Sequence, residues 1–139
     1  MLNRLELQTL AKMRVREAKT LLRNGHFEGA YYLLGYAVEC ALKACIAKQI
    51  KKHDFPDKKI VNQSYTHELG TLFDLSGLKI NFQKEIVTNS QLEKNWATVK
   101  DWKEESRYRN GIPEKQVKDF FSAVTARKNG ILTWIKKSW

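Results

Sequence analysis

The sequence predicts an all-α fold, an up-and-down bundle of about five helices in a single domain over residues 1–139. Apolar residues recur at intervals of three and four in several long segments, and period-two alternation never extends beyond a few residues. The chain contains 7 Gly and 2 Pro among 139 residues, which disfavours a many-stranded fold. Hydrophobic residues make up 42% of the chain, enough to form a core at this length.

The first two helices are predicted from their end signals and from their apolar spacing. Asn3 is an expected N-cap with Glu6 three residues later, which is the spacing of a capping box. The Asn-Gly pair at 24–25 ends this helix. A second helix is expected over about 27–52, where apolar residues leave little polar surface. It should be the central and most buried helix.

The middle of the chain is less regular. Residues 51–65 mix charged residues with Pro and Asn without any period, which predicts a surface loop. Thr66 can cap a short helix that ends at the Ser-Gly pair 76–77. The pattern over 80–88 is ambiguous.

Two more helices are predicted in the C-terminal half. Ser90 and Glu93 form a Ser-x-x-Glu capping box, and the helix should run to about the start of the break at 107–113. Pro113 fits the first position of the last helix, where a missing N–H is tolerated. Gly130 should weaken that helix by about 1 kcal/mol relative to Ala. One apolar stripe along it comprises Val117, Phe120, Phe121, Val124, Ile131, Leu132 and Ile135.

The charge balance indicates an anionic partner. Lys and Arg number 25 against 15 Asp and Glu, a formal net charge of +10. Such an excess attracts RNA, DNA, nucleotides or an acidic protein, but it carries no information about base specificity.

The cysteines and the N-terminus favour a cytoplasmic protein. Cys40 and Cys45 fall in one predicted helix and point about 140° apart, so they cannot form a disulfide with each other. Charged residues run through the N-terminal segment, no apolar signal region is present, and no uncharged stretch reaches the length of a membrane span. We therefore expect no membrane partner.

No motif points to a cofactor or a metal. Gly-rich phosphate loops are absent from the sequence, and the histidines His26, His53 and His67 have no metal-site spacing. His67, near the start of a short helix, is either a surface or capping residue or a catalyst.

One polar group interrupts the apolar second helix. Glu39 and Lys43 lie four residues apart, with Tyr36 nearby. They either form an ordinary solvated pair worth about 0.3–0.5 kcal/mol or line a polar cleft. In the cleft, Glu39 would accept a hydrogen bond from Arg107 or Arg109.

Arg107, Tyr108, Arg109 and Asn110 place two guanidinium groups, a phenol and an amide at a predicted helix end. Guanidinium groups suit phosphate oxygens, and tyrosine can stack on a base. The alternative is a surface helix terminus whose cations oppose the helix dipole, with Glu105 paired to Arg109.

Residues 17–46, EAKTLLRNGHFEGAYYLLGYAVECALKACI, resemble the opening of HEPN domains, the family named for higher eukaryotes and prokaryotes nucleotide-binding. A T-H-E-L sequence, a W-x-x-x-x-R-Y segment and the final amphipathic helix follow in the same order as in the family. The matching residues in the opening are Gly25, Phe27, Ala30, Leu33, Ala37, Val38, Glu39, Leu42, Lys43 and Ala44.

The resemblance implies a helical bundle, frequently homodimeric, from prokaryotic toxin–antitoxin or defence systems, often encoded beside a minimal nucleotidyltransferase. Many members are metal-independent endoribonucleases that use an R-x4-6-H motif. Arg107 and Arg109 occupy the region of the family's arginine, but no histidine follows His67. The residues that could replace the missing proton carrier are Glu114, Tyr108 and His67.

Three hypotheses follow. The first is a non-catalytic or degenerate HEPN module that binds RNA, a nucleotide or a partner protein, acts as a homodimer and has no cofactor. Its ligand-binding residues would be Arg107, Tyr108, Arg109, Asn110, Glu39, Lys43 and Tyr36. The second is an endoribonuclease toxin with an altered active site. The third is a structural dimerisation subunit whose charge only keeps it in solution.

Overall fold

A computed structural model describes residues 2–52 and 57–139, and of residues 51 and 52 only the backbone is described. Within these residues the chain forms helices and no strands, as expected. Eight α-helices and one 3-10 helix occur in the described ranges, more than the five or so expected, because the C-terminal two thirds divides into short pieces. They are α1 (Arg4–Arg23), α2 (Phe27–Lys52), α3 (Lys58–Gln63), α4 (Leu69–Leu75), α5 (Lys79–Ile86), α6 (Ser90–Val99), η1 (Glu104–Tyr108), α7 (Glu114–Thr125) and α8 (Ile131–Ile135).

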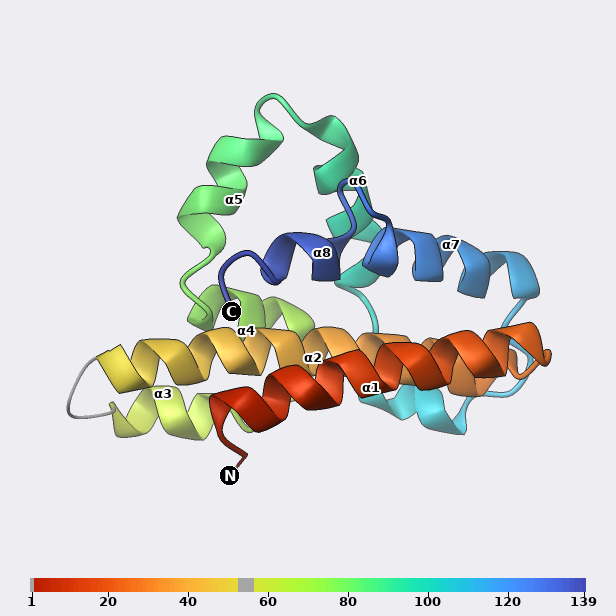
Figure 1. The fold of residues 1–139 in the computed structure, drawn as a ribbon, viewed down its shortest axis with the longest axis horizontal. Helices are drawn as coiled ribbons and strands as arrows, with labels where there is room; N and C mark the ends of the chain where they lie inside the picture. Colours follow the sequence, from red (N-terminus) through yellow and green to blue (C-terminus); the bar gives the residue numbers. More distant parts are fainter. Residues whose placement is uncertain (1, 53–56) are drawn as a thin grey trace.

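The two long helices α1 and α2 lie side by side as an antiparallel hairpin (Figure 1). The predicted capping box is present: Asn3 Oδ1 accepts from the Glu6 amide at 2.8 Å, and Glu6 Oε2 accepts from the Asn3 amide at 2.8 Å. Gly25 joins the helices with φ +77°, in the left-handed region that glycine adopts without strain. The sequence prediction for both helices is confirmed.

The helix α2 is the core of the molecule. It packs against α1 along its length and also contacts α4, η1, α7 and α8. This confirms the prediction that the second helix is central. Its buried residues are Ala30, Tyr31, Leu34, Ala37, Val38, Glu39, Cys40, Ala41, Leu42, Ala44, Cys45 and Ile46.

By length and composition alone, residues 27–50 of α2 could also cross a membrane. Their mean hydropathy reaches 1.2 over an 18-residue window, but 72% of that window is buried inside the protein. The core helix of a globular protein passes the same test, so the apolar character of α2 is accounted for by packing.

The expected loop over 51–65 is partly wrong. Residues 53–56 lie outside the described residues, but α3 occupies 58–63. Asp57 caps this helix by accepting from the Lys59 amide at 2.9 Å. In α3 only Ile60 and Val61 are partly buried. Two apolar residues are too few to show a helical period in the sequence, so the helix was not predicted.

The short helix predicted after Thr66 is confirmed as α4. Thr66 Oγ1 accepts from the Glu68 amide at 3.2 Å, and the helix begins one residue after Glu68. Gly77, with φ +80°, ends this region as predicted. The ambiguous residues 80–88 fall mostly in α5, whose one buried residue is Phe82.

The helix predicted from the Ser90 capping box starts there, but its cap and its end differ. Asn89 is the N-cap and accepts from the Leu92 amide at 3.2 Å. The helix ends at Val99 instead of near residue 107. Trp102, just beyond the end of this helix, packs closely against Gly35 in α2.

The predicted last helix is two helices. Pro113 precedes α7 as its N-cap instead of occupying its first turn. The chain then leaves the helix at Ala126 and restarts after Gly130. Asn95 of α6 supports this break by donating to the carbonyl of Asn129 at 2.7 Å, and Thr133 donates to the carbonyl of Ala126 at 2.8 Å. Gly130 therefore separates two helices instead of weakening one.

Aromatic packing joins the short helices to one another. Phe73 of α4 packs edge-on against Phe82 of α5, with 5.2 Å between ring centroids. It also packs at a tilt against Trp96 of α6, with 4.7 Å between ring centroids. Phe82 also contacts Trp134 of α8 at 5.5 Å. Four short helices thus share one aromatic cluster. Helices of this length are not stable in isolation, and the packing in the cluster stabilises them.

Candidate functional site

Glu39 is an acidic residue in the middle of the core helix α2, and it is only 2% exposed. Its Oε2 atom lies 3.1 Å from the Nζ atom of Lys43, one turn further along α2. Because a buried carboxylate is costly without partners, this pair is more than a solvated surface contact. The predicted pairing of Glu39 with Lys43 is present.

His67 supplies the second partner of Glu39. It lies just before α4, and its Nδ1 atom is 3.0 Å from both carboxylate oxygens of Glu39. The His67 side chain is 44% exposed, so one edge of the ring is anchored in the core while the other meets solvent. A buried carboxylate orients this ring in the way that acid–base histidines are oriented in many sites.

The opposite edge of the His67 ring faces η1. Its Nε2 atom is 3.6 Å from Glu104 Oε2, and Glu104 Oε1 lies 3.0 Å from the Nη1 atom of Arg107. The five residues Lys43, Glu39, His67, Glu104 and Arg107 therefore form a continuous line in which acidic and basic side chains alternate, which we call the ion-pair row. It joins α2, the segment before α4, and η1.

The geometry determines which His67 nitrogen is available for chemistry. Because a carboxylate only accepts hydrogen bonds, Nδ1 carries a proton where it meets Glu39. In the neutral ring Nε2 is then the unprotonated nitrogen. The distance of 3.6 Å from Nε2 to Glu104 Oε2 is too long for a hydrogen bond, so Nε2 is available to accept a hydrogen bond from a hydroxyl group of a ligand.

Arg107 is held beside aromatic side chains at the exposed end of the row. Its guanidinium carbon is 4.7 Å from the ring centroid of Tyr108, which is 76% exposed. Partial desolvation acts to lower the pKa of Arg107, but hydrogen bonds with Tyr32 and Tyr108 and the charge of Glu104 outweigh it and raise the pKa. A permanent cation next to an exposed ring can hold a phosphate and stack a base.

The two arginines of the predicted cluster do not converge. Arg109 and Asn110 are both exposed. The charge of Arg109 is felt by Tyr31 of α2: burial raises the pKa of Tyr31, and the Arg109 charge partly opposes this rise. The expectation that Glu39 accepts from Arg107 or Arg109 is wrong. Residues 104–108 form a 3-10 helix, so Arg107 meets Glu104 three residues earlier.

Two further predictions concern the flanks of this cluster. Among the described ion pairs, Arg109 is not paired with Glu105, because the 3-10 helix ends at Tyr108 and no α-helical turn brings them together. Glu114, a candidate proton carrier, begins α7 and pairs with Lys118 at 3.3 Å instead of joining the ion-pair row.

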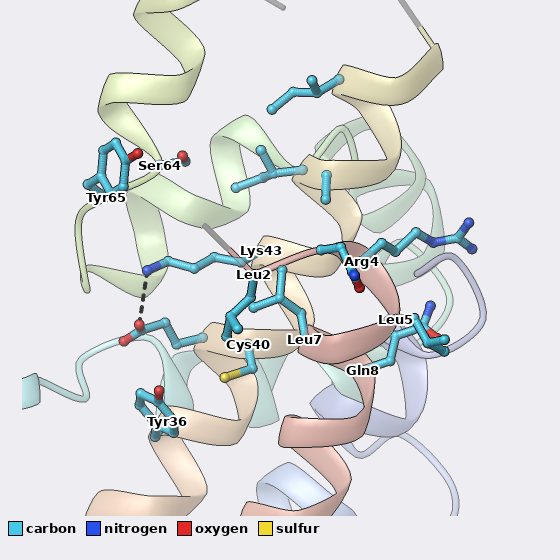
Figure 2. A pocket seen from close by; sticks show the side chains of 15 residues that line it. Leu2, Arg4, Leu5, Leu7, Gln8, Tyr36, Cys40, Lys43, Ser64 and Tyr65 are labelled. Carbon is cyan, nitrogen blue, oxygen red and sulfur yellow. Dashed lines mark hydrogen bonds and ion pairs between the residues drawn. The ribbon is translucent and has the colours of Figure 1, made fainter.

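Three predicted ligand residues, Tyr36, Glu39 and Lys43, line a cavity of about 830 Å³ between α1, α2 and the end of α3 (Figure 2). The residues 107–110 are not part of its lining. The predicted binding residues thus divide between a cavity wall and an exposed tip. Glu39 lines the cavity and is linked to Arg107 of the tip only through His67 and Glu104.

Sequence reasoning missed Glu104, and it left His67 open between capping and catalysis. The spacing of Glu104 and Arg107, three residues apart, was the available signal for their pair. Nothing in the local pattern indicates that His67 meets Glu39, because 28 residues separate them. Within the described ranges, no group of three His, Cys, Asp or Glu side chains is arranged to hold a metal ion.

Comparison with known proteins agrees with this helical arrangement. A family model described as the HEPN domain matches residues 6–137, nearly the whole chain. Searches of curated proteins and of solved structures give no match.

Proposed function

Because the chain belongs to the HEPN domain family, we propose that it is a non-catalytic, RNA- or nucleotide-binding module of a prokaryotic toxin–antitoxin or defence system. Family membership supports a nucleotide-related helical module. The observation that carries the proposal is Arg107, which is held between Glu104 and the exposed ring of Tyr108. This arrangement presents a cation and a stacking surface together at the protein surface.

The whole-molecule charge supports the same ligand class. A net charge of +10 raises the local concentration of a polyanion around the protein. The exposed tip at residues 107–110 then adds local contacts, with Tyr108 offering its ring to one base and Arg107 contacting a phosphate. The net charge would attract RNA to the protein, and the contacts at the tip would fix where the RNA binds.

The double variant Arg107→Ala and Arg109→Ala tests this proposal. We expect it to weaken the binding of a short single-stranded RNA about tenfold or more in fluorescence anisotropy, and to flatten the salt dependence of binding. The matched control is Lys84→Ala with Lys94→Ala, which removes the same charge from exposed positions on α5 and α6. Equal losses in the two double variants would show that only net charge matters.

The partner proposals need separate measurements. We propose that the module acts as a homodimer in the cytoplasm and that a minimal nucleotidyltransferase is its protein partner. Light scattering coupled to size exclusion determines the oligomeric state, and co-purification with the product of the neighbouring gene tests the partner. A monomer that co-purifies with nothing would leave only the RNA proposal.

A second candidate function, a metal-independent endoribonuclease, is favoured by the position of His67. Its Nδ1 atom is held by Glu39, and its Nε2 atom faces Glu104, which in turn contacts Arg107. In this reaction Nε2 takes the proton of a ribose 2′-hydroxyl and the 2′ oxygen attacks phosphorus. The bond to the 5′ oxygen breaks, that oxygen takes a proton from solvent water, and a 2′,3′-cyclic phosphate remains. The proton held on Nε2 then returns to solvent. Arg107 would stabilise the charge on the phosphate oxygens.

The variant His67→Gln separates binding from cleavage. If the protein is a ribonuclease, wild type yields cyclic-phosphate ends and His67→Gln loses cleavage while it still binds RNA in the anisotropy assay. A substrate with a 2′-deoxyribose at the cleaved position would resist both proteins. RNA that stays intact with wild type over a long incubation excludes the nuclease and leaves the binding module.

A further inference from the structure

The cavity beside the ion-pair row has three walls. Figure 2 shows the start of α1 on one side, the segment of α2 from Tyr36 to Ile50 along the cavity, and Ser64 and Tyr65 after α3 on the other side. Its volume is about 830 Å³. Pockets that bind small organic molecules fall in the range of about 300–1,000 Å³, so the cavity is large enough for such a ligand.

The lining combines an apolar part with polar side chains on all three walls. Along α2 the polar side chains are Tyr36, Glu39 and Lys43, and further polar residues are Asn3, Arg4 and Gln8 from the start of α1 and Ser64 and Tyr65 after α3. A ligand that fits must bury an apolar body and place a polar group at one end. The apolar part is formed by Leu2, Leu5, Leu7, Ile46, Ala47 and Ile50.

The charge of the lining selects the sign of the polar group. Its charged residues are Arg4, Lys43 and Glu39, but the Arg4 guanidinium donates to the carbonyl of Trp139, which leaves Lys43 and Glu39 to select the ligand. Glu39 is already shared between Lys43 and His67. Lys43 donates one ammonium proton to Glu39, and an ammonium group has three donors. An anion therefore finds an available donor, whereas a cation would compete with two existing partners.

We propose that this cavity binds a small amphipathic carboxylate, a molecule with an aliphatic or aryl body whose carboxylate accepts from Lys43. This site is separate from the RNA contact at the 107–110 tip and does not depend on it.

The test titrates the full-length protein with decanoate by isothermal titration calorimetry. We expect one saturable site, with decanol, which lacks the charge, binding at least about tenfold more weakly. Lys43→Gln should weaken decanoate binding and leave decanol binding unchanged. That result would assign the carboxylate to the Lys43 end of the cavity.

A matched pair of surface variants places the site. Leu5, 70% exposed at the cavity wall, changes to Glu, which puts a like charge at the entrance without disturbing the core. Ile80, 68% exposed on α5 and outside the lining, changes to Glu as the control. We expect Leu5→Glu to weaken decanoate binding at least about tenfold and Ile80→Glu to leave it unchanged.

Three results would overturn the proposal. The first is the absence of saturable decanoate binding, and the second is an equal effect of the two Glu variants. The third is a wild-type dimer that Leu5→Glu converts to a monomer, because a second copy of the chain would then occupy the groove. RNA binding is measured on the same samples, with Ile80→Glu as the control for the change in net charge, and wild-type RNA binding and wild-type decanoate binding are scored separately, so failure of one site does not decide the other.

Discussion

Gly35 determines how closely η1 and the turn before it can approach the core. A Cβ atom at this position would lie 2.1 Å from the indole carbon Cε2 of Trp102, whose side chain is buried. Gly35→Ala should therefore destabilise the protein by about 1–3 kcal/mol in urea unfolding, because the indole must move out of its packed position.

Gly70 is the control for that substitution, because it also lies in a helix but has open space at its Cβ position. Gly70→Ala should leave stability unchanged or raise it by about 0.5–1 kcal/mol through lower chain entropy in the unfolded state. A similar stability of the two variants would contradict the close approach of Trp102 to α2.

The two cysteines should be inert while the protein is folded. Burial raises the pKa of Cys40 to about 12, with the charge of Glu39 adding to the effect, and burial raises the pKa of Cys45 to about 11. Since the thiolate is the reactive form, we expect a disulfide reagent at pH 8 to label native protein at least about 100-fold more slowly than urea-unfolded protein. Rapid labelling of either thiol in native protein would contradict this burial.

At the residue scale, contacts between residues close in the sequence could be predicted, whereas contacts between residues far apart in the sequence could not. The pair of Glu39 and Lys43 could be read from their spacing on one helix, because side chains four residues apart are neighbours. The contact between Glu39 and His67 depends on how α4 packs against α2, and no local pattern encodes that. Arg107 was identified by its chemistry, but its partner depends on the 3-10 geometry of residues 104–108.

The break between α7 and α8 makes a prediction at the scale of elements. A Cβ atom at Gly130 would lie 2.4 Å from the carbonyl oxygen of Ala126 and 2.6 Å from its nitrogen. Backbone atoms cannot yield as a side chain can, so Gly130→Ala should destabilise the protein in thermal or urea unfolding. A continuous helix would give the opposite sign, a gain of about 1 kcal/mol.

Glu28 ties the start of α2 to the turn before α7. Its pKa is lowered by hydrogen bonds from its own backbone amide and from the amide of Gly111, which is 2.8 Å from Oε1. A depressed native pKa stabilises the fold above the ordinary value of 4.5, and this contribution is lost as the pH falls through the native pKa.

The variant Glu28→Gln tests this tie. It should unfold at a lower urea concentration than wild type at pH 7, and the difference should shrink as the pH falls below 4.5 and through the native pKa of Glu28. The measurement is the urea midpoint of both proteins at each pH. A difference that stays constant with pH would show that the carboxylate charge is not involved.

At the element scale, long helices with end signals were predictable and short ones were not. α1 and α2 have capping residues, a glycine turn and many apolar repeats, so local information was enough. α3 has only six residues and two partly buried ones. The break at 126–130 lies inside a continuous apolar stripe, and it exists because Asn95 of another helix binds the carbonyl of Asn129.

On the scale of the whole molecule, the fold separates a buried central helix from exposed edges that carry the candidate functional residues. α2 contacts α1, α4, η1, α7 and α8, whereas α5 stands on the aromatic cluster and contacts mainly α6. The ion-pair row passes through the buried Glu39 and ends at the exposed Arg107. A rigid helix thereby positions groups that act at the surface, which is how binding residues are usually supported.

This distribution of contacts predicts the pattern of amide hydrogen exchange. Amides in the middle of α2 should exchange only when the whole protein unfolds, because five other elements cover that helix. Amides of α3 should exchange fastest among the described helices, since α3 is short and packs weakly on the rest of the chain. Amides of α5 should be intermediate, because Phe82 anchors that helix through contacts with Phe73, Trp96 and Trp134.

Hydrogen exchange followed by mass spectrometry of peptides measures this order directly. The variant Phe82→Ala should accelerate exchange in α5 much more than in α2, because it removes the anchor without touching the α1–α2 hairpin. Uniform acceleration across all helices would mean that the aromatic cluster and the hairpin unfold as one cooperative unit. The central helix and the exposed edges would then be inseparable, and substitutions at the tip would have to be judged by their effect on global stability first.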